Sequence, residues 1–307
     1  MDGELKLIGV TSGGRNGPYN IGAEAFDNRV DVFESWIEDN TKTPSAVKAT
    51  FSNGNLTLRG GSGDNEVYVA DGWVLGVGAT TINGASAYQL PDELSGNLTL
   101  QFTKGNTKLF VTSQDVGGNV IYKGGKQADS VWFESISIGG NLNAKGGNGS
   151  DSLRLNAVEI LGTLNANLGG GNDQLHMSDD SSTQGKATFT GGNGNDEIVI
   201  QNASFGDDLF FKTGGGGDFV FIDSVQITES LNANMGGGSD DLYATGITTN
   251  GSAAPVLNGA GGNDDLQQVG NSFATAPRIT FEGTTVPNAV ARANAVIDKV
   301  FEDSLFG

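Results

Sequence analysis

The chain has 307 residues, of which 49 are glycine, 6 are proline and none is cysteine. So few prolines exclude a collagen, and the lack of cysteine excludes disulfides, thiolate zinc sites and a cysteine nucleophile. The formal net charge of −19 comes from 17 Lys and Arg against 36 Asp and Glu. That charge excludes a nucleic-acid binder that relies on a basic patch, and it favours cations as partners. No apolar run reaches the roughly 20 residues of a membrane span.

The first 50 residues are the least regular part of the sequence. Residues 28–35 (Asn-Arg-Val-Asp-Val-Phe-Glu-Ser) resemble the stretch that begins at Asp129 (Asp-Ser-Val-Trp-Phe-Glu-Ser). We therefore interpret residues 1–50 as an N-terminal cap with an irregular first copy of a repeat. Residues 37–50 are expected to form an inserted loop.

From residue 51 to 282 the chain repeats with a period of about 22 residues, a length typical of solenoid repeats. Weak copies end at Asn65, Ser86 and Thr107. In each copy, apolar residues lie two and four positions after the residue that ends the copy. This alternation is typical of a short half-buried strand. A second apolar column lies nine residues before each end, for example at Leu142 and Leu164, and a third, patchier one lies mid-repeat. Strong copies end at seven aspartates, spaced at nearly constant intervals of one period: Asp129, Asp151, Asp173, Asp196, Asp218, Asp240 and Asp264.

Three short strands in a single repeat cannot form a compact domain alone, but stacked copies bury a continuous core. We therefore predict an all-β fold, a right-handed parallel β-helix (β-solenoid) of about ten rungs over residues 51–282. A β-propeller is the alternative, but its blades need about 40 residues or more. Residues 283–307 carry Pro287 and then a helical apolar stripe, which predicts a C-terminal capping helix over the last rung.

A glycine-rich corner, Gly-Gly-x-Gly-x-Asp, precedes the strand of each strong copy. It is complete at residues 146–151 and 191–196, and one or two positions change in the other copies. This corner resembles the nonapeptide of haemolysin-type (RTX) calcium-binding repeats over residues 124–268. It departs from that family because the motif recurs once per rung, so that only one column of ions could form. The resemblance implies that glycine carbonyls and the aspartate carboxylate bind Ca²⁺ through Asp129, Gly146, Gly147, Asn148, Gly149, Asp151, Gly170, Gly171, Asp173, Gly191, Gly192, Asn193, Gly194, Asp196, Gly215, Gly216, Asp218, Gly237, Gly238, Asp240, Gly261, Gly262 and Asp264.

The electrostatics of stacked carboxylates favour the same ion. Aspartates on rungs about 4.8 Å apart repel each other by about 1 kcal/mol or more, and no Lys or Arg column runs beside them. Ca²⁺ accepts six to eight hard oxygen ligands. The alternative is that glycine and aspartate simply form a tight corner, with the carboxylate accepting backbone N–H groups. The corners at Asn65, Ser86 and Thr107 lack the acid and are expected to hold no ion.

Other candidate site residues give weaker signals. His176 lies on the outward side of its strand and is expected to be solvated. Asp179 and Asp180, with Asp207 and Asp208 one rung on, could form a carboxylate cluster for glycoside cleavage, although few basic residues lie nearby to hold an acidic sugar.

These observations favour a secreted or cell-surface, calcium-binding solenoid with a structural or adhesive role. The alternative is a polysaccharide-active enzyme, a lyase or glycoside hydrolase of the parallel β-helix type. Enzymatic activity stays undecided, with a non-enzymatic role favoured. The expected partners are calcium ions and a cell-surface glycan or another surface protein.

Overall fold

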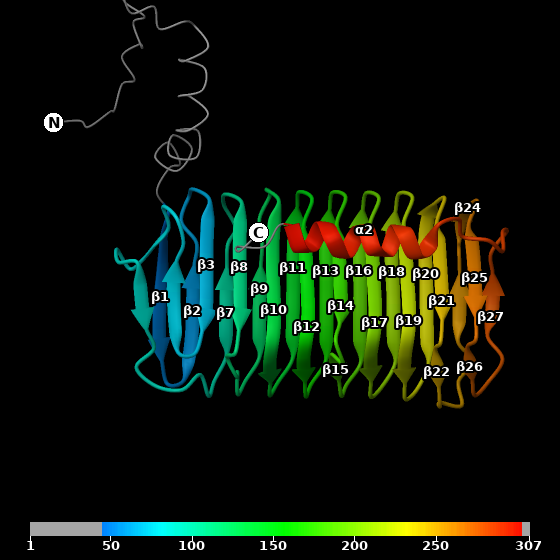
Figure 1. Ribbon diagram of the computed structural model, residues 1–307, viewed down its shortest axis with the longest axis horizontal. Helices are drawn as coiled ribbons and strands as arrows, with labels where there is room; N and C mark the ends of the chain where they lie inside the picture. The colour runs from blue at the N-terminus through cyan, green and yellow to red at the C-terminus, as the bar shows by residue number, and fades with distance from the viewer. Residues whose placement is uncertain (1–44, 303–307) are drawn as a thin grey trace, which may run out of the picture. The chain divides into compact units, whose positions relative to one another are not determined.

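Two long, mainly parallel sheets form the body of a β-solenoid with about eight turns and a period of about 22 residues (Figure 1). The computed structural model describes residues 45–302. In each complete turn the chain follows one strand of sheet 1, passes the glycine corner, follows one strand of sheet 2 and returns to the next strand of sheet 1. The predicted fold class is therefore confirmed.

Sheet 1 contains 13 strands. In spatial order they are β5 (Thr81–Ile82), β1 (Ala46–Ser52), β2 (Asn55–Arg59), β7 (Leu98–Gln101), β9 (Val120–Lys123), β11 (Leu142–Asn148), β13 (Leu164–Gly170), β16 (Ala187–Asn193), β18 (Leu209–Gly215), β20 (Leu231–Gly238), β23 (Val256–Asn258) and β27 (Arg278–Thr280), with β24 (Gly261–Gly262) paired to β20.

Sheet 2 contains 14 strands. They are β6 (Ala87–Gln89), β4 (Trp73–Gly76), β3 (Asn65–Ala70), β8 (Thr107–Thr112), β10 (Asp129–Ile138), β12 (Ser152–Ile160), β14 (Gln174–Ser178), β17 (Glu197–Phe205), β19 (Phe219–Ile227), β21 (Asp241–Thr245) and β25 (Asp265–Val269), with β15 (Ser182–Thr183), β22 (Thr248–Thr249) and β26 (Ser272–Phe273) beside them.

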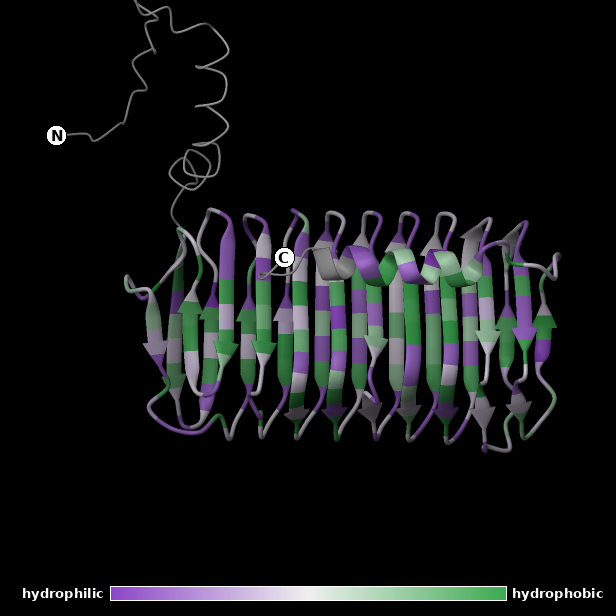
Figure 2. Cartoon of the chain, viewed as in Figure 1, coloured by the Kyte–Doolittle hydropathy of each residue, from purple (hydrophilic) through white to green (hydrophobic). Residues whose placement is uncertain are grey.

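The pairing register reproduces the period read from the sequence. Leu142 pairs with Leu164, and Leu153 pairs with Leu175, so residues one repeat apart lie on neighbouring strands. These apolar side chains point inward and are almost fully buried. Hydrophobic and hydrophilic residues alternate along the strands, as the banding in Figure 2 shows. Each turn therefore adds one layer to a continuous apolar core.

The predicted strand that follows each aspartate and the predicted mid-repeat strand are usually one bent strand. β10, β12, β17 and β19 run on through the bend, whereas β14 and β15 stay separate. At the bend one residue per turn, followed by Asp180 in the turn after β14, adopts a left-handed backbone conformation, which lets the chain change direction. The bend residues are Ser113, Ser135, Ala157, Asp179, Asn202, Ser224 and Gly246, with φ between 48° and 60°.

The prediction of a repeat ending at Ser86 is wrong. Asn65 pairs directly with Thr107, and Leu56 pairs with Leu98, so one predicted copy is skipped. Instead β3, β4 and β6 form antiparallel pairs at the start of sheet 2. The sequence steps from Asn65 to Ser86 and from Ser86 to Thr107 are close to one period in length, so the hairpins resemble an additional repeat. This is one reason why the solenoid has about eight turns and not ten.

Of the predicted N-terminal cap, residues 1–50, the structure describes only the part from residue 45 onward. β1 pairs antiparallel with β2 as part of sheet 1, so residues 46–50 are strand and not loop. The predicted irregular copy at residues 28–35 lies outside the described residues, as does the rest of the cap up to residue 44.

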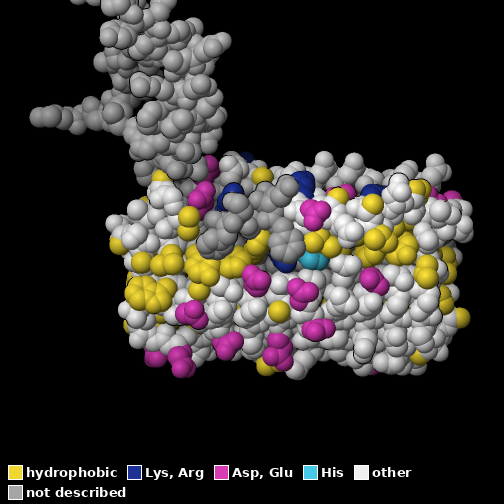
Figure 3. All heavy atoms as spheres, viewed as in Figure 1, with side chains coloured by type: hydrophobic (Ala, Val, Ile, Leu, Met, Phe, Trp, Pro, Cys, Tyr) yellow, Lys and Arg dark blue, Asp and Glu magenta, His cyan; other side chains and the backbone are white. Residues whose placement is uncertain are grey.

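The C-terminal helix α2 (Ala289–Glu302) forms as predicted, but it does not cover the last rung. It packs lengthwise against the outer face of sheet 2, on β12, β14, β17 and β19 (Figure 1). Its buried residues Ala289, Ala293 and Val296 join a second apolar cluster with Phe219 and Phe221. The position differs because sheet 2 offers outward-facing apolar side chains here, and Figure 3 shows such side chains in a band across this face.

Candidate functional site

The seven predicted aspartates form a buried column inside the solenoid, which we call the aspartate column. Each lies where a glycine corner ends and a strand of sheet 2 begins. Their exposed fractions are between 0% and 4%. Carboxylates are rarely buried to this degree unless hydrogen bonds or counter-ions compensate for lost hydration. Their partners therefore decide what the column can do.

One oxygen of each carboxylate joins two turns. Oδ1 of each aspartate accepts a hydrogen bond from a backbone N–H one turn earlier, so the column is a continuous ladder along the solenoid. The last aspartate donates its own N–H to Glu282 Oε2 at 3.1 Å. The N···Oδ1 distances are 2.9 Å from Thr107 to Asp129, 2.8 Å from Asp129 to Asp151, 2.6 Å from Asp151 to Asp173, 2.9 Å from Asp173 to Asp196, 2.8 Å from Asp196 to Asp218, 2.8 Å from Asp218 to Asp240 and 3.0 Å from Asp240 to Asp264.

The other oxygen, Oδ2, is buried without a hydrogen-bond partner in six of the seven aspartates. Asp129 is the exception, because its Oδ2 accepts from the Tyr122 hydroxyl at 2.9 Å and from the Gly125 N–H at 3.3 Å. A buried, unsatisfied carboxylate oxygen costs several kcal/mol, so it needs a proton or a cation. The six aspartates are Asp151, Asp173, Asp196, Asp218, Asp240 and Asp264.

Asn65, in the corner where β3 begins, shows what this position requires. Its Oδ1 accepts hydrogen bonds from Ser45 and Gly61, much as an aspartate oxygen would. Its Nδ2 donates to the carbonyls of Gly63 and Lys104, at 3.0 and 3.1 Å. The second side-chain atom at this corner therefore meets backbone carbonyl oxygens. Its Oδ1 accepts from Gly61 as Asp129 Oδ2 accepts from Gly125, so the amide of Asn65 satisfies this corner with an oxygen in the place of Oδ2 and a nitrogen in the other place.

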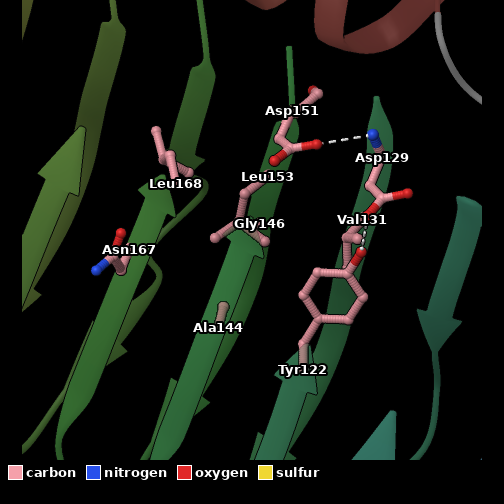
Figure 4. A pocket seen from close by; sticks show the side chains of 10 residues that line it. Tyr122, Asp129, Val131, Ala144, Gly146, Asp151, Leu153, Asn167 and Leu168 are labelled. Atoms are coloured by element: carbon pink, nitrogen blue, oxygen red, sulfur yellow. Dashed lines mark hydrogen bonds between the residues drawn. The ribbon is translucent and has the colours of Figure 1, made fainter. Parts of the chain in front are cut away.

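The first glycine of the corner keeps the space beside Oδ2 open. A Cβ on Gly146 would lie 2.3 Å from Asp151 Oδ2 and 2.3 Å from the Leu168 carbonyl oxygen of the next turn. At Gly191 the same two distances are 2.3 Å to Asp196 Oδ2 and 2.6 Å to the Thr213 carbonyl. Figure 4 shows Asp129, Asp151, Tyr122 and Gly146 around a cavity of about the size of one water molecule. Carboxylate and carbonyl oxygens thus converge on one small space.

The second position of the corner requires glycine for a purely structural reason. Gly169 has a φ of 115°, and a Cβ there would lie 1.9 Å from the Gly147 carbonyl oxygen. Only glycine fits where two turns approach so closely, whether or not an ion binds. The glycines of the motif are therefore weaker evidence for calcium than the aspartates.

Not every predicted ligand lies near the column. Asn148 and Asn193 lie at the ends of β11 and β16 with exposed side chains. They share an outward row with Gly170, Gly215 and Gly237. The structure brings four of the aspartates together with the first glycine of their corners, and it leaves these side chains outside.

Burial raises the pKa of six carboxyl groups in the aspartate column, those of Asp129, Asp151, Asp173, Asp196, Asp218 and Asp240. It raises the pKa of Asp151, Asp196 and Asp240 to about 7 and that of Asp173 to about 6. The hydrogen bond from the neighbouring backbone N–H opposes this effect. At Asp151, Asp196 and Asp240 the adjacent aspartates raise the pKa further. Near neutral pH these groups therefore exchange between the acid, which can donate to a carbonyl, and the carboxylate, which can bind a cation.

The prediction that His176 is a solvated surface residue is wrong. It points away from the core, but α2 packs on its strand β14 and only 3% of it is exposed. Burial, together with the neighbouring Arg154 guanidinium, lowers the His176 pKa to about 4. The covering helix begins only at Ala289, several repeats further along the chain, so no local pattern could reveal it.

The structure does not bring the proposed carboxylate cluster together. Asp179 and Asp180 lie between β14 and β15, whereas Asp207 and Asp208 lie between β17 and β18, at a different corner of the turn. Within residues 45–302 no group of three or more His, Cys, Asp or Glu side chains is arranged to hold a metal ion. Any cation at the aspartate column would thus depend on backbone carbonyls for most of its ligands.

Comparison with protein families, with curated proteins and with solved structures finds no match for this chain. Among the described residues, no helix is both long and apolar enough to cross a membrane. The geometry of the solenoid and its aspartate column therefore carries the functional argument.

Proposed function

We propose that this chain is a secreted or cell-surface β-solenoid with a structural or adhesive role, and that calcium ions stabilise it by binding along the aspartate column. The observation that carries the proposal is the set of buried Oδ2 atoms without partners. At Asp151 and Asp196 the Oδ2 atom faces a main-chain carbonyl across a space that Gly146 or Gly191 keeps open. Uncompensated carboxylates in that position would oppose folding.

The donor chemistry fits calcium. Ca²⁺ prefers carboxylate and carbonyl oxygens and tolerates irregular geometry, whereas Mg²⁺ demands a near-ideal octahedron and keeps its waters. Asp151 Oδ2 with the Leu168 carbonyl, and Asp196 Oδ2 with the Thr213 carbonyl, are the pairs that would hold an ion. Seven aspartates leave six gaps between consecutive turns, which sets the upper number of such ions.

An extracellular location suits calcium sites of low affinity. Calcium modules outside cells work with dissociation constants of roughly 10⁻⁴ to 10⁻³ M, a range in which sites stay empty in the cytosol. The chain contains no cysteine, so it cannot use the disulfides that stabilise many secreted proteins. Calcium binding would supply the missing stabilisation.

Calcium should raise the melting temperature at pH 8, which lies above the pKa of about 7 of the Asp151, Asp196 and Asp240 carboxyl groups. Because the unfolded chain cannot align the ligands, each independent site at tenfold saturation adds about 1.4 kcal/mol. Three such sites would raise Tm by about 10 °C. The measurement is calorimetric melting in chelator and in roughly millimolar calcium.

Three variants locate the effect. Asp196→Ala should lose part of the calcium-dependent shift, while Ser86→Ala, in an exposed turn far from the column, should keep all of it. Asp196→Asn should also lose part of the shift but should be stable in chelator, because its amide can donate to carbonyls as Asn65 does. Identical wild-type melting curves in chelator and in calcium would refute the calcium role.

A further inference from the structure

The acidic residues of the described strands all lie in sheet 2. No Asp or Glu lies in any of the 13 strands of sheet 1, although the chain contains 36 of them. Sheet 1 instead carries Lys48, Arg59, Lys123, Lys145, Lys212 and Arg278. The strands of sheet 2 carry the acids Glu66, Asp129, Glu134, Glu159, Glu197, Asp223, Asp241 and Asp265.

Four of these basic residues form one row across five consecutive strands, which we call the basic row. Lys48 pairs with Arg59, Arg59 with Gln101, Gln101 with Lys123, and Lys123 with Lys145. The four charged side chains are exposed. At about 4.8 Å per strand the row spans about 19 Å of the outer face of sheet 1.

Nothing in the described part of the chain neutralises this row. None of its four basic side chains takes part in an ion pair or a side-chain hydrogen bond within residues 45–302. Lys123 and Lys145 are direct neighbours across two parallel strands, and like charges in that arrangement are destabilising. A row of cations that no described residue neutralises, on a protein with a net charge of −19, would suit an anion.

The neighbouring row supplies hydroxyl and amide groups. Thr50 pairs with Thr57, Thr57 with Thr99, Thr99 with Ile121, and Ile121 with Asn143. Neither row contains an aromatic side chain, so the surface lacks the stacking platforms on which proteins bind single-stranded nucleic acids. Alternating lines of cations and hydrogen-bonding groups instead suit a polymer that carries both carboxylates and hydroxyls.

We propose that the basic row binds an extended acidic polysaccharide. This inference rests on the proposed adhesive role and names its ligand class. A polysaccharide with one carboxylate per sugar is sparsely charged and matches a row of four cations in about 19 Å. Duplex DNA carries one charge per roughly 1.7 Å and would be repelled by the net charge of the rest of the molecule.

The test is calorimetric titration with short alginate and polygalacturonate oligomers, with calcium held constant. The double variant Lys123→Glu/Lys145→Glu should weaken binding about tenfold or more, and added salt should weaken wild-type binding. The matched control is Lys108→Glu/Lys299→Glu, which changes the net charge equally but lies on exposed positions of β8 and α2. The control should bind as the wild type does.

Each other outcome has a defined meaning. An absence of wild-type binding, or an equal loss in both double variants, would overturn the basic row as a polysaccharide site. Equal binding of a single-stranded oligonucleotide or of polyglutamate would overturn the assignment to polysaccharide. Failure of the calcium role would appear separately, as unchanged melting in chelator while lysine-dependent binding persists.

Discussion

At the scale of single residues, Asn65 and the aspartate column show two solutions to one problem. At Asn65 the amide satisfies its corner by itself, because its oxygen accepts from N–H and O–H groups and its nitrogen donates to main-chain carbonyls. An aspartate can do so only with a proton or an ion bound. Replacing the amide by a carboxyl group therefore makes the stability of the corner dependent on solution conditions.

In chelator, stability should fall as pH rises from about 4 through about 7. The carboxyl pKa values of Asp151, Asp196 and Asp240 are about 7 when folded and 3.8 in their unperturbed form. The folded state therefore binds more protons in that range, and each carboxyl contributes stability at low pH that is lost on deprotonation. The loss should be on the order of 2 kcal/mol per carboxyl.

Chemical denaturation at several pH values in chelator measures this slope. Asp196→Asn should have a shallower slope than the wild type, because its amide does not titrate. Stability that increases between pH 5 and 8, or an identical slope in the variant, would show that these carboxyls do not bind protons in the folded state.

Close packing of the corners makes a separate prediction for glycine. Gly169→Ala should lower the free energy of unfolding by on the order of 2 kcal/mol or more, because its Cβ would collide with the Gly147 carbonyl and its φ is positive. Gly237→Ala is the matched control, since nothing lies within 4 Å of its Cβ position. Equal stability of the two variants in urea would contradict the packing argument.

The sequence located the aspartates of the column but not their environment. Their spacing follows directly from the repeat, and their hydrogen bonds to backbone N–H groups were one of two open alternatives. The unpartnered Oδ2 atoms, the Tyr122 hydroxyl on Asp129 and the final contact with Glu282 depend on stacking between turns. Such contacts join residues at least 7 positions apart and leave no local pattern.

At the scale of elements, periodicity predicted the strands well and misplaced two features. Alternating apolar residues fix which side of a strand faces the core, so inward positions such as Leu142 and Leu153 were evident. The copy at Ser86 fits the period by coincidence, because antiparallel hairpins alternate in the same way. Amphipathicity predicted α2 but could not specify which apolar surface it covers.

Helix α2 should detach when its buried face is made polar. Val296 is 1% exposed and packs in the outer cluster, whereas Val290 on the same helix is 55% exposed. Val296→Asp should uncover β14 and raise the His176 pKa from about 4 toward its ordinary value near 6.5, because burial is the main cause of the lowered pKa. Val290→Asp should leave it unchanged.

Titration of the His176 ring by NMR measures this directly. The solenoid itself should stay folded in the Val296→Asp variant, because its core lies on the other side of sheet 2. A His176 pKa near 4 in that variant would show that the helix does not shield the ring.

At the scale of the whole solenoid, function is divided among its surfaces. The interior holds the aspartate column, the outer face of sheet 2 carries α2, and the outer face of sheet 1 carries the basic row. Composition alone predicted an acidic protein with few basic residues. The separation becomes visible only when the register places Lys48, Arg59, Lys123 and Lys145 side by side.

The ladder of aspartates also bears on how a molecule of this kind could change length. Each turn from 129 to 263 offers the turn before it an Oδ1 acceptor and the turn after it a backbone N–H donor. Two turns that are not adjacent would therefore meet without a mismatch if the turn between them were lost, and a tandem duplication would meet its copy equally well. Gain or loss of whole repeats would thus preserve the hydrogen bonds between turns. Gain or loss of a partial repeat would shift every later side chain out of register.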